Sequence, residues 1–106
     1  MVTPTRGRLL DGSDAPRTGE LVGPLVQLGD VVIEQILSSQ LDDPVDYDQD
    51  HDEWVVLLAG AAELEVHGDR LTLGPGDWLV LPRGVPHRLV RTTQGSSWLA
   101  VRVPAR

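Results

Sequence analysis

Two short stretches in the middle of the chain decide its fold: Glu53-Trp54-Val55-Val56-Leu57-Leu58-Ala59-Gly60 and Gly76-Asp77-Trp78-Leu79-Val80-Leu81-Pro82-Arg83-Gly84-Val85-Pro86-His87. In the first, an apolar run ends at a glycine, which is typical of a strand covered on both faces. In the second, a glycine turn precedes a short apolar strand, and two prolines bound the loop that leads to His87. Between them, Glu63 to Leu73 predicts a tight hairpin with its turn at His67-Gly68-Asp69-Arg70.

Short strand-like segments flank this central region. Val31 to Leu37 is rich in β-branched residues and predicts a strand, whereas Leu21 to Leu28 reads as apolar pieces broken by Gly23-Pro24. His87 to Arg91 and Trp98 to Val103 predict the last two strands. Because 11 Gly and 8 Pro punctuate 106 residues, we expect about eight short strands in an all-β sandwich or barrel.

The domain organisation follows from this pattern. Residues 1–20 mix Pro, Gly, Arg, Asp and Thr, and we expect an N-terminal arm that is loosely ordered or packs on the barrel. Residues 21–106 are expected to form a single domain.

Composition excludes several classes of function. A net charge of −7 opposes binding to nucleic acid or to an anionic membrane surface. The chain has no Cys, so disulfides and thiolate metal sites are ruled out. No apolar run approaches the roughly 18–20 residues of a membrane helix, and Met1 to Leu10 lacks the apolar segment of a signal peptide. A cytoplasmic protein is expected.

The two quoted stretches resemble the two motifs of the cupin family. Glu53, six residues and Gly60 match the second half of the first motif. Gly76, five residues, Pro82-Arg83-Gly84, two residues and His87 match nearly all of the second, with fifteen residues between the matches. The resemblance covers residues 30–103 and implies a small β-barrel of jelly-roll type. The segment Tyr47 to Trp54 also resembles a subgroup of small single-domain cupins.

The chain departs from the family at the metal ligands. Metal-binding cupins place two His, one residue apart, shortly before the motif Glu. Here the corresponding pair is Tyr47 and Gln49, or Asp46 and Asp48, and the Asn that often ends the second motif is Arg91.

Four residues are candidates to hold a divalent transition metal such as Mn, Fe, Zn or Ni: His87, Glu53, Gln49 and His51. Glu53 shares strand parity with Tyr47, Gln49 and His51, so all four can face the interior. His51, Glu53 and His87 together would supply the two His and one carboxylate of open-sided iron or manganese sites. In the alternative, His87 is a neutral side chain bonded to Glu53 or Gln49, and His51 lies in a solvent-side turn.

Three residues are candidates for contact with an organic ligand: Tyr47, Gln49 and Arg91. Arg91 is four residues after His87 and is expected on the same face, where a guanidinium would bind a carboxylate and so predict an anionic ligand. Its alternative role is an ion pair with Glu53 or an acidic loop. Glu53 is also a candidate acid or base, because a carboxylate inside an apolar barrel must pair, bind metal or take up a proton.

Three functions therefore remain open. The first is a metal-dependent enzyme or binding protein for a small organic molecule, and the second is a metal-free binding or sensing barrel. The third is a structural domain whose apolar faces serve dimerisation. The outward positions Trp54, Val56 and Leu58 need the N-terminal arm or a second subunit over them, so a homodimer is expected.

Overall fold

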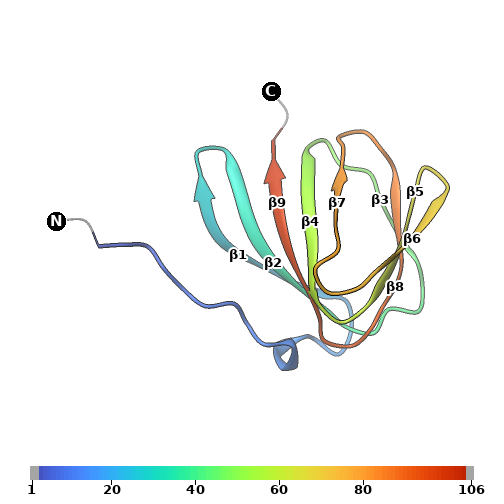
Figure 1. Ribbon diagram of the computed structural model, residues 1–106, viewed down its shortest axis with the longest axis horizontal. Helices are drawn as coiled ribbons and strands as arrows, with labels where there is room; N and C mark the ends of the chain where they lie inside the picture. Colours follow the sequence, from blue (N-terminus) through green and yellow to red (C-terminus); the bar gives the residue numbers. More distant parts are fainter. Residues whose placement is uncertain (1–2, 105–106) are drawn as a thin grey trace.

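Two antiparallel sheets form the fold seen in the computed structural model, which describes residues 3–104 (Figure 1). The larger sheet has the strand order β1 (Glu20–Leu28), β2 (Val31–Ser38), β9 (Ser96–Val103), β4 (Asp52–Ala59), β7 (Trp78–Leu81). The smaller has the order β3 (Val45–Tyr47), β8 (His87–Thr92), β5 (Ala62–Val66), β6 (Asp69–Leu73). A single 3-10 turn, η1 (Gly12–Asp14), precedes them. The all-β prediction is confirmed.

The first strand differs from its prediction. Leu21 to Leu28 was expected to be broken at Gly23-Pro24, but it forms one strand, and the register with β2 shifts between Pro24 and Val26. Proline has no backbone N–H to donate, and it is tolerated here because β1 is an edge strand. The irregularity absorbs the proline without ending the strand.

The core lies between the sheets and uses alternate residues of each strand. Val55 and Leu57 of β4 pack there with Leu64, Leu89 and Trp98. Successive side chains of a strand point to opposite faces. The other parity of β4 therefore places Trp54 and Val56 on the outer face of the larger sheet, next to Trp78 of β7.

The second half of the N-terminal arm packs against the larger sheet. The side chain of Gln35 accepts a hydrogen bond from Leu10 N at 2.8 Å and donates one to Leu10 O at 2.9 Å. Further along, Gln94 donates to the carbonyl of Pro16, and Ser39 N donates to that of Gly19. These bonds hold the arm over β2 and the β8–β9 turn.

Within residues 3–104, no helix has both the length and the hydropathy needed to cross a membrane.

Gly60 supplies a turn that no larger residue fits. It follows β4 with φ at 89°, in the left-handed region that favours glycine. A Cβ added there would overlap Ser96 Oγ and lie 2.8 Å from Ser96 Cα and 2.9 Å from Thr93 Oγ1. This close approach explains why the first quoted stretch ends in glycine.

We predict that Gly60→Ala lowers the free energy of unfolding by about 1–3 kcal/mol more than Gly68→Ala does, because of overpacking. Gly68 is the matched control, since its φ of 78° carries the same backbone strain but an added Cβ meets nothing within 4 Å. Urea unfolding of the two variants measures the difference. Equal losses of stability would mean that the contacts with Ser96 and Thr93 do not constrain residue 60.

Candidate functional site

A cavity of about 250 Å³ lies between the two sheets. Its apolar lining consists of Val22, Ile36, Val55, Leu64, Leu81, Leu89 and Trp98. Its polar lining consists of Glu20, Glu34, Tyr47, Gln49, His51, Glu53, His87 and Arg102. An apolar cavity with a few converging polar groups is the usual form of a small-molecule site.

Tyr47 and His87 form one wall of the cavity from the smaller sheet. They are partners in the register of β3 and β8. Their rings stack with centroids 5.4 Å apart and an interplanar angle of 14°. The His87 Nδ1 atom lies 3.5 Å from the carbonyl oxygen of Val85, within the proline-bounded loop. Stacking and the loop together set the orientation of the imidazole.

A chain of hydrogen bonds fixes Glu20 at the edge of the larger sheet. The Tyr47 hydroxyl donates to Glu20 Oε1 at 2.9 Å, and the Ser38 hydroxyl donates to Glu20 Oε2 at 2.8 Å. The indole N–H of Trp98 donates in turn to Ser38 Oγ at 3.2 Å. Because Tyr47 lies on β3 and Glu20 on β1, the chain also ties the two sheets together.

Burial raises the pKa of the Tyr47 hydroxyl above its ordinary range. The charge of Glu20 and its hydrogen bond raise that pKa further, and the charge of Glu53 adds a smaller effect. All of these favour the neutral phenol, which is the form that can donate to Glu20.

Glu53 and His51 meet on the opposite wall. His51 Nε2 lies 3.2 Å from Glu53 Oε2, and His51 Nδ1 lies 3.5 Å from Asp50 Oδ1. The side-chain amide of Gln49 donates weakly to the backbone carbonyl of His51 at 3.4 Å, and the backbone carbonyl of Gln49 accepts from Gly84 N at 2.9 Å. The segment before β4 is thereby tied to the loop before His87.

The candidate metal ligands do not assemble into a three-ligand site. Across residues 3–104, no group of three or more His, Cys, Asp and Glu side chains is arranged to hold a metal ion. His51 and Glu53 are in contact, whereas His87 stacks on Tyr47. The chain thus offers one carboxylate–imidazole pair rather than the two-His, one-carboxylate set that the sequence suggested.

The expectation that Arg91 faces the interior is wrong. Glu63 pairs with Arg91 and Leu64 with Leu89, so β8 carries one extra residue at this point and its parity reverses. The Arg91 guanidinium instead donates to Glu63 Oε1 at 3.0 Å on the outer face. The anionic ligand that an inward Arg91 implied loses its support.

Three charged residues of the lining were not predicted from the sequence: Glu20, Glu34 and Arg102. Glu34 has the parity of Val32 and Ile36, and Arg102 has the parity of Trp98 and Ala100. In both cases the alternation along the strand therefore predicts a charged side chain that points into the cavity. Glu20 had no such signal, because the proline after it obscured the strand.

The fold and the sequence together identify the class of protein. A family model described as the cupin domain matches residues 32–102. The chain therefore belongs to the cupin family, and the jelly-roll prediction is confirmed.

Several relatives of known structure share this fold. A protein from Ralstonia eutropha JMP134, provisionally named a mannose-6-phosphate isomerase, is 36% identical with a TM-score of 0.80, covering 96% of this chain and 100% of that one. A cupin superfamily protein from Desulfitobacterium hafniense DCB-2 is 21% identical with a TM-score of 0.71, and 94% of each chain is covered. KdgF from Halomonas sp. is 23% identical with a TM-score of 0.69, covering 83% of this chain and 82% of that one. The last two show the fold alone.

One curated relative matches over only part of this chain. An uncharacterized protein of Aquifex aeolicus (strain VF5) is 34% identical over 59 residues, which are 56% of this chain. The match spans 49% of the length of that protein.

Tyr47 is the only tyrosine in the chain, so its ionisation can be followed directly by the ultraviolet absorbance of phenolate. We predict that it titrates above the ordinary value of about 10 in the folded protein and at about 10 in denaturant. Glu20→Gln should lower this pKa but leave it raised, because burial is the larger cause. A folded protein titrating at the ordinary value would contradict the burial and hydrogen bonding of Tyr47.

The same shift sets a pH dependence of stability. Because the folded-state pKa is raised, the contribution to stability is complete below about pH 10 and is lost as the pH rises toward the folded-state value.

Proposed function

We propose that this cupin domain binds a small organic molecule in the cavity between its sheets. The observation that carries the proposal is the cavity itself, whose lining combines apolar side chains with several polar groups. Its volume of about 250 Å³ lies just below the range of about 300–1,000 Å³ that holds drug-sized ligands. The ligand is therefore small.

Tyr47, Gln49 and His87 are the proposed contacts of this ligand from the smaller sheet and its loops. Their positions are held by the stacking of Tyr47 on His87 and by the hydrogen bond from Gly84 to Gln49. Rigid placement reduces the entropy lost on binding. If the site carries out chemistry, Glu53 is the proposed acid or base, because its contact with His51 allows the pair to hold a proton between them.

The activity in the name of the Ralstonia eutropha protein is not carried over to this chain. A phosphate ester brings close to two negative charges at neutral pH. The cavity lining sets three carboxylates, those of Glu20, Glu34 and Glu53, against the single guanidinium of Arg102. Such a lining does not favour a sugar phosphate.

A metal-dependent function is the second candidate, and the contact between His51 and Glu53 favours it. An imidazole and a carboxylate in contact inside a cavity are two ligands of the types that Mn, Fe, Zn and Ni accept. His87 on the facing wall would be the third ligand, but within residues 3–104 it is not grouped with His51 and Glu53 as a metal site requires. For this reason we place metal-free binding first.

We predict that soluble fragments of up to about ten non-hydrogen atoms bind with measurable affinity in the presence of EDTA. Amide chemical shifts should change around Val55, Leu64 and Leu89. Val22→Trp should block the binding, because Val22 lines the cavity and is half exposed. The control is Val103→Trp, on an exposed residue outside the cavity lining. No binding by any fragment, or equal binding by Val22→Trp, would refute the proposal.

Metal analysis of the same protein distinguishes metal-free binding from a metal-dependent function. Protein purified without a His tag is analysed for Mn, Fe, Zn, Ni and Cu, and then offered each ion. Less than about a tenth of an equivalent, not restored by addition, rules out the metal-dependent function. A stoichiometric ion that His51→Ala removes, with fragment binding lost in EDTA, would put the metal-dependent function first.

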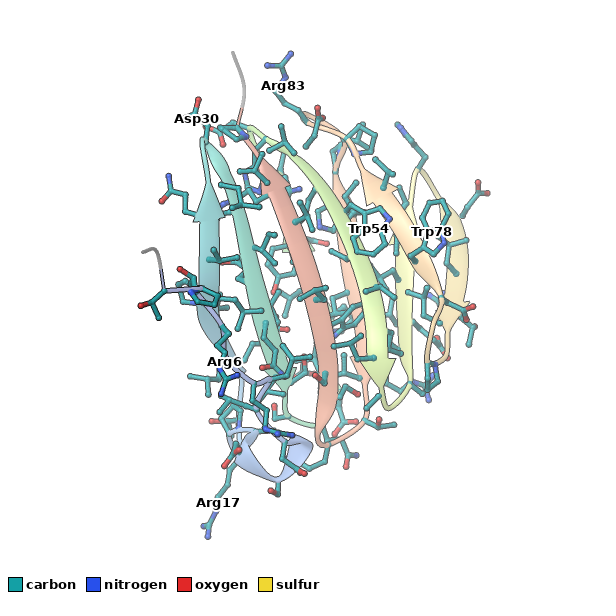
Figure 2. All side chains as sticks on the ribbon, turned by 60° about the vertical axis from the view of Figure 1, so that its left-hand side comes forward. Arg6, Arg17, Asp30, Trp54, Trp78 and Arg83 are labelled. Atoms are coloured by element: carbon teal, nitrogen blue, oxygen red, sulfur yellow. The ribbon has the colours of Figure 1, made fainter. Side chains whose placement is uncertain are left out.

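We propose further that the domain forms a homodimer through the outer face of β4 and β7. Trp54 pairs with Val80 and Val56 with Trp78 in the register of these strands. Figure 2 shows Trp54 and Trp78 next to each other on this face, while Arg6 and Arg17 of the arm lie toward β1 and β2. The ring centroids of Trp54 and Trp78 are 6.2 Å apart. Since the arm covers β2, a second copy is the proposed cover for β4 and β7.

We predict that the protein sediments as a dimer at micromolar concentration and that Trp78→Lys makes it a monomer. An aromatic side chain at the centre of an interface contributes strongly to association, and a buried lysine opposes it. The control is Leu28→Lys, because Leu28 on β1 has the same exposed fraction, 61%, as Trp78. A wild-type monomer at every concentration, or dissociation by both variants alike, would contradict this interface.

A further inference from the structure

Glu34 is a buried carboxylate that the protein itself leaves without a partner. Its side chain lines the cavity, and the residue is only 8% exposed. Its register neighbours are Pro24 on β1 and Ala100 on β9, which carry no polar side-chain atoms. No hydrogen bond or ion pair within residues 3–104 reaches the carboxylate, and none of its oxygens is sealed off from the cavity.

The other two carboxylates of the cavity already have partners. Both oxygens of Glu20 accept hydrogen bonds, one from Tyr47 and one from Ser38. Glu53 contacts His51 at 3.2 Å. Because the Glu34 carboxylate accepts from no donor within residues 3–104 and its oxygens remain accessible, it is the carboxylate of the cavity to which a donor from a ligand adds a new hydrogen bond.

The charge of the lining points to the sign of that ligand. The three carboxylates face one guanidinium, that of Arg102. Arg102 stands directly opposite Glu53 in the register of β4 and β9. Opposite it on β2 is Val32 rather than Glu34. The cavity thus holds more carboxylates than guanidinium groups, and Glu34 is the carboxylate that contacts no partner within residues 3–104.

We propose that the ligand of this cavity is an organic cation, a small molecule with an apolar body and an ammonium or amidinium group that donates to Glu34. This inference rests on the proposed small-molecule function and adds the class of ligand to it. The apolar body would lie against Ile36, Leu64 and Leu89. Tyr47 and Trp98 also line the cavity, and an aromatic ring attracts a cation that lies over its face.

Three probes of the same shape test the inference: benzylammonium, benzyl alcohol and benzoate. We expect benzylammonium to bind at least about tenfold more tightly than benzyl alcohol, and benzoate to bind most weakly. Titrations by calorimetry or NMR are run in EDTA, so that no metal ion bridges a probe to the protein. The Val22→Trp variant identifies binding inside the cavity.

Variants of Glu34 test whether this residue causes the preference for benzylammonium over benzyl alcohol. Glu34→Gln removes the charge at constant shape and should weaken benzylammonium binding about 10- to 100-fold, without weakening benzyl alcohol. Glu34→Asp keeps the charge and should retain the preference, which provides a second variant if Glu34→Gln is poorly folded. Glu63→Gln is the matched control, because Glu63 lies outside the cavity lining and pairs with Arg91. It should change neither affinity.

The outcomes distinguish failure of the organic-cation proposal from failure of the proposed small-molecule binding. Benzyl alcohol binding as tightly as benzylammonium, or a Glu34→Gln variant that binds benzylammonium like the wild type, overturns the organic cation while binding in the cavity stands. Binding of Mn or Zn alone, lost in both Glu34→Gln and EDTA, also overturns it in favour of a metal ion. Failure of every probe and every fragment overturns both proposals.

Discussion

The alternation of side chains along each strand is the constraint on which this structure depends. In β4 it sends Val55 and Leu57 into the core and Trp54 and Val56 to the outer face. In β2 and β9 it sends Glu34 and Arg102 inward among apolar residues. A small barrel has few inward positions, and a charged side chain on one of them is unfavourable unless the protein, solvent or a ligand supplies a partner. The distribution of those partners is what gives the cavity its chemical character.

The frame of the domain was readable from the sequence because it depends on local features. Turns at Gly60, at Gly76 and at the prolines around His87 are fixed by the backbone preferences of glycine and proline. The apolar runs between these turns match the observed strands. The wall of the cavity was less readable because it depends on register. One extra residue in β8 turns Arg91 outward, and the residues near Arg91 contain no pattern that predicts this irregularity. The partnership of Tyr47 with Glu20 joins strands of different sheets, so no spacing along the chain predicts it.

The candidate site differs from the pattern of metal ligands that the resemblance to cupins implies. The positions that correspond to the histidines of metal-binding members are Tyr47 and Gln49, or Asp46 and Asp48 by the other spacing, and neither pair contains His. Tyr47 donates to Glu20 and stacks on His87. The residual pair, His51 and Glu53, is a weak basis for metal binding and a reasonable one for moving a proton.

Pro24 in β1 has a consequence for how copies of this domain can meet. An open sheet exposes a row of backbone donors and acceptors at each edge, where another chain can add a strand and start a fibre. The proline removes one donor from the edge of β1, and the adjacent irregularity breaks the even spacing of the rest. The opposite edge, β7, offers only four residues. Both ends of the sheet thus make growth along it difficult, which agrees with the proposal that copies meet through the face of the sheet, where a two-fold assembly closes after two subunits.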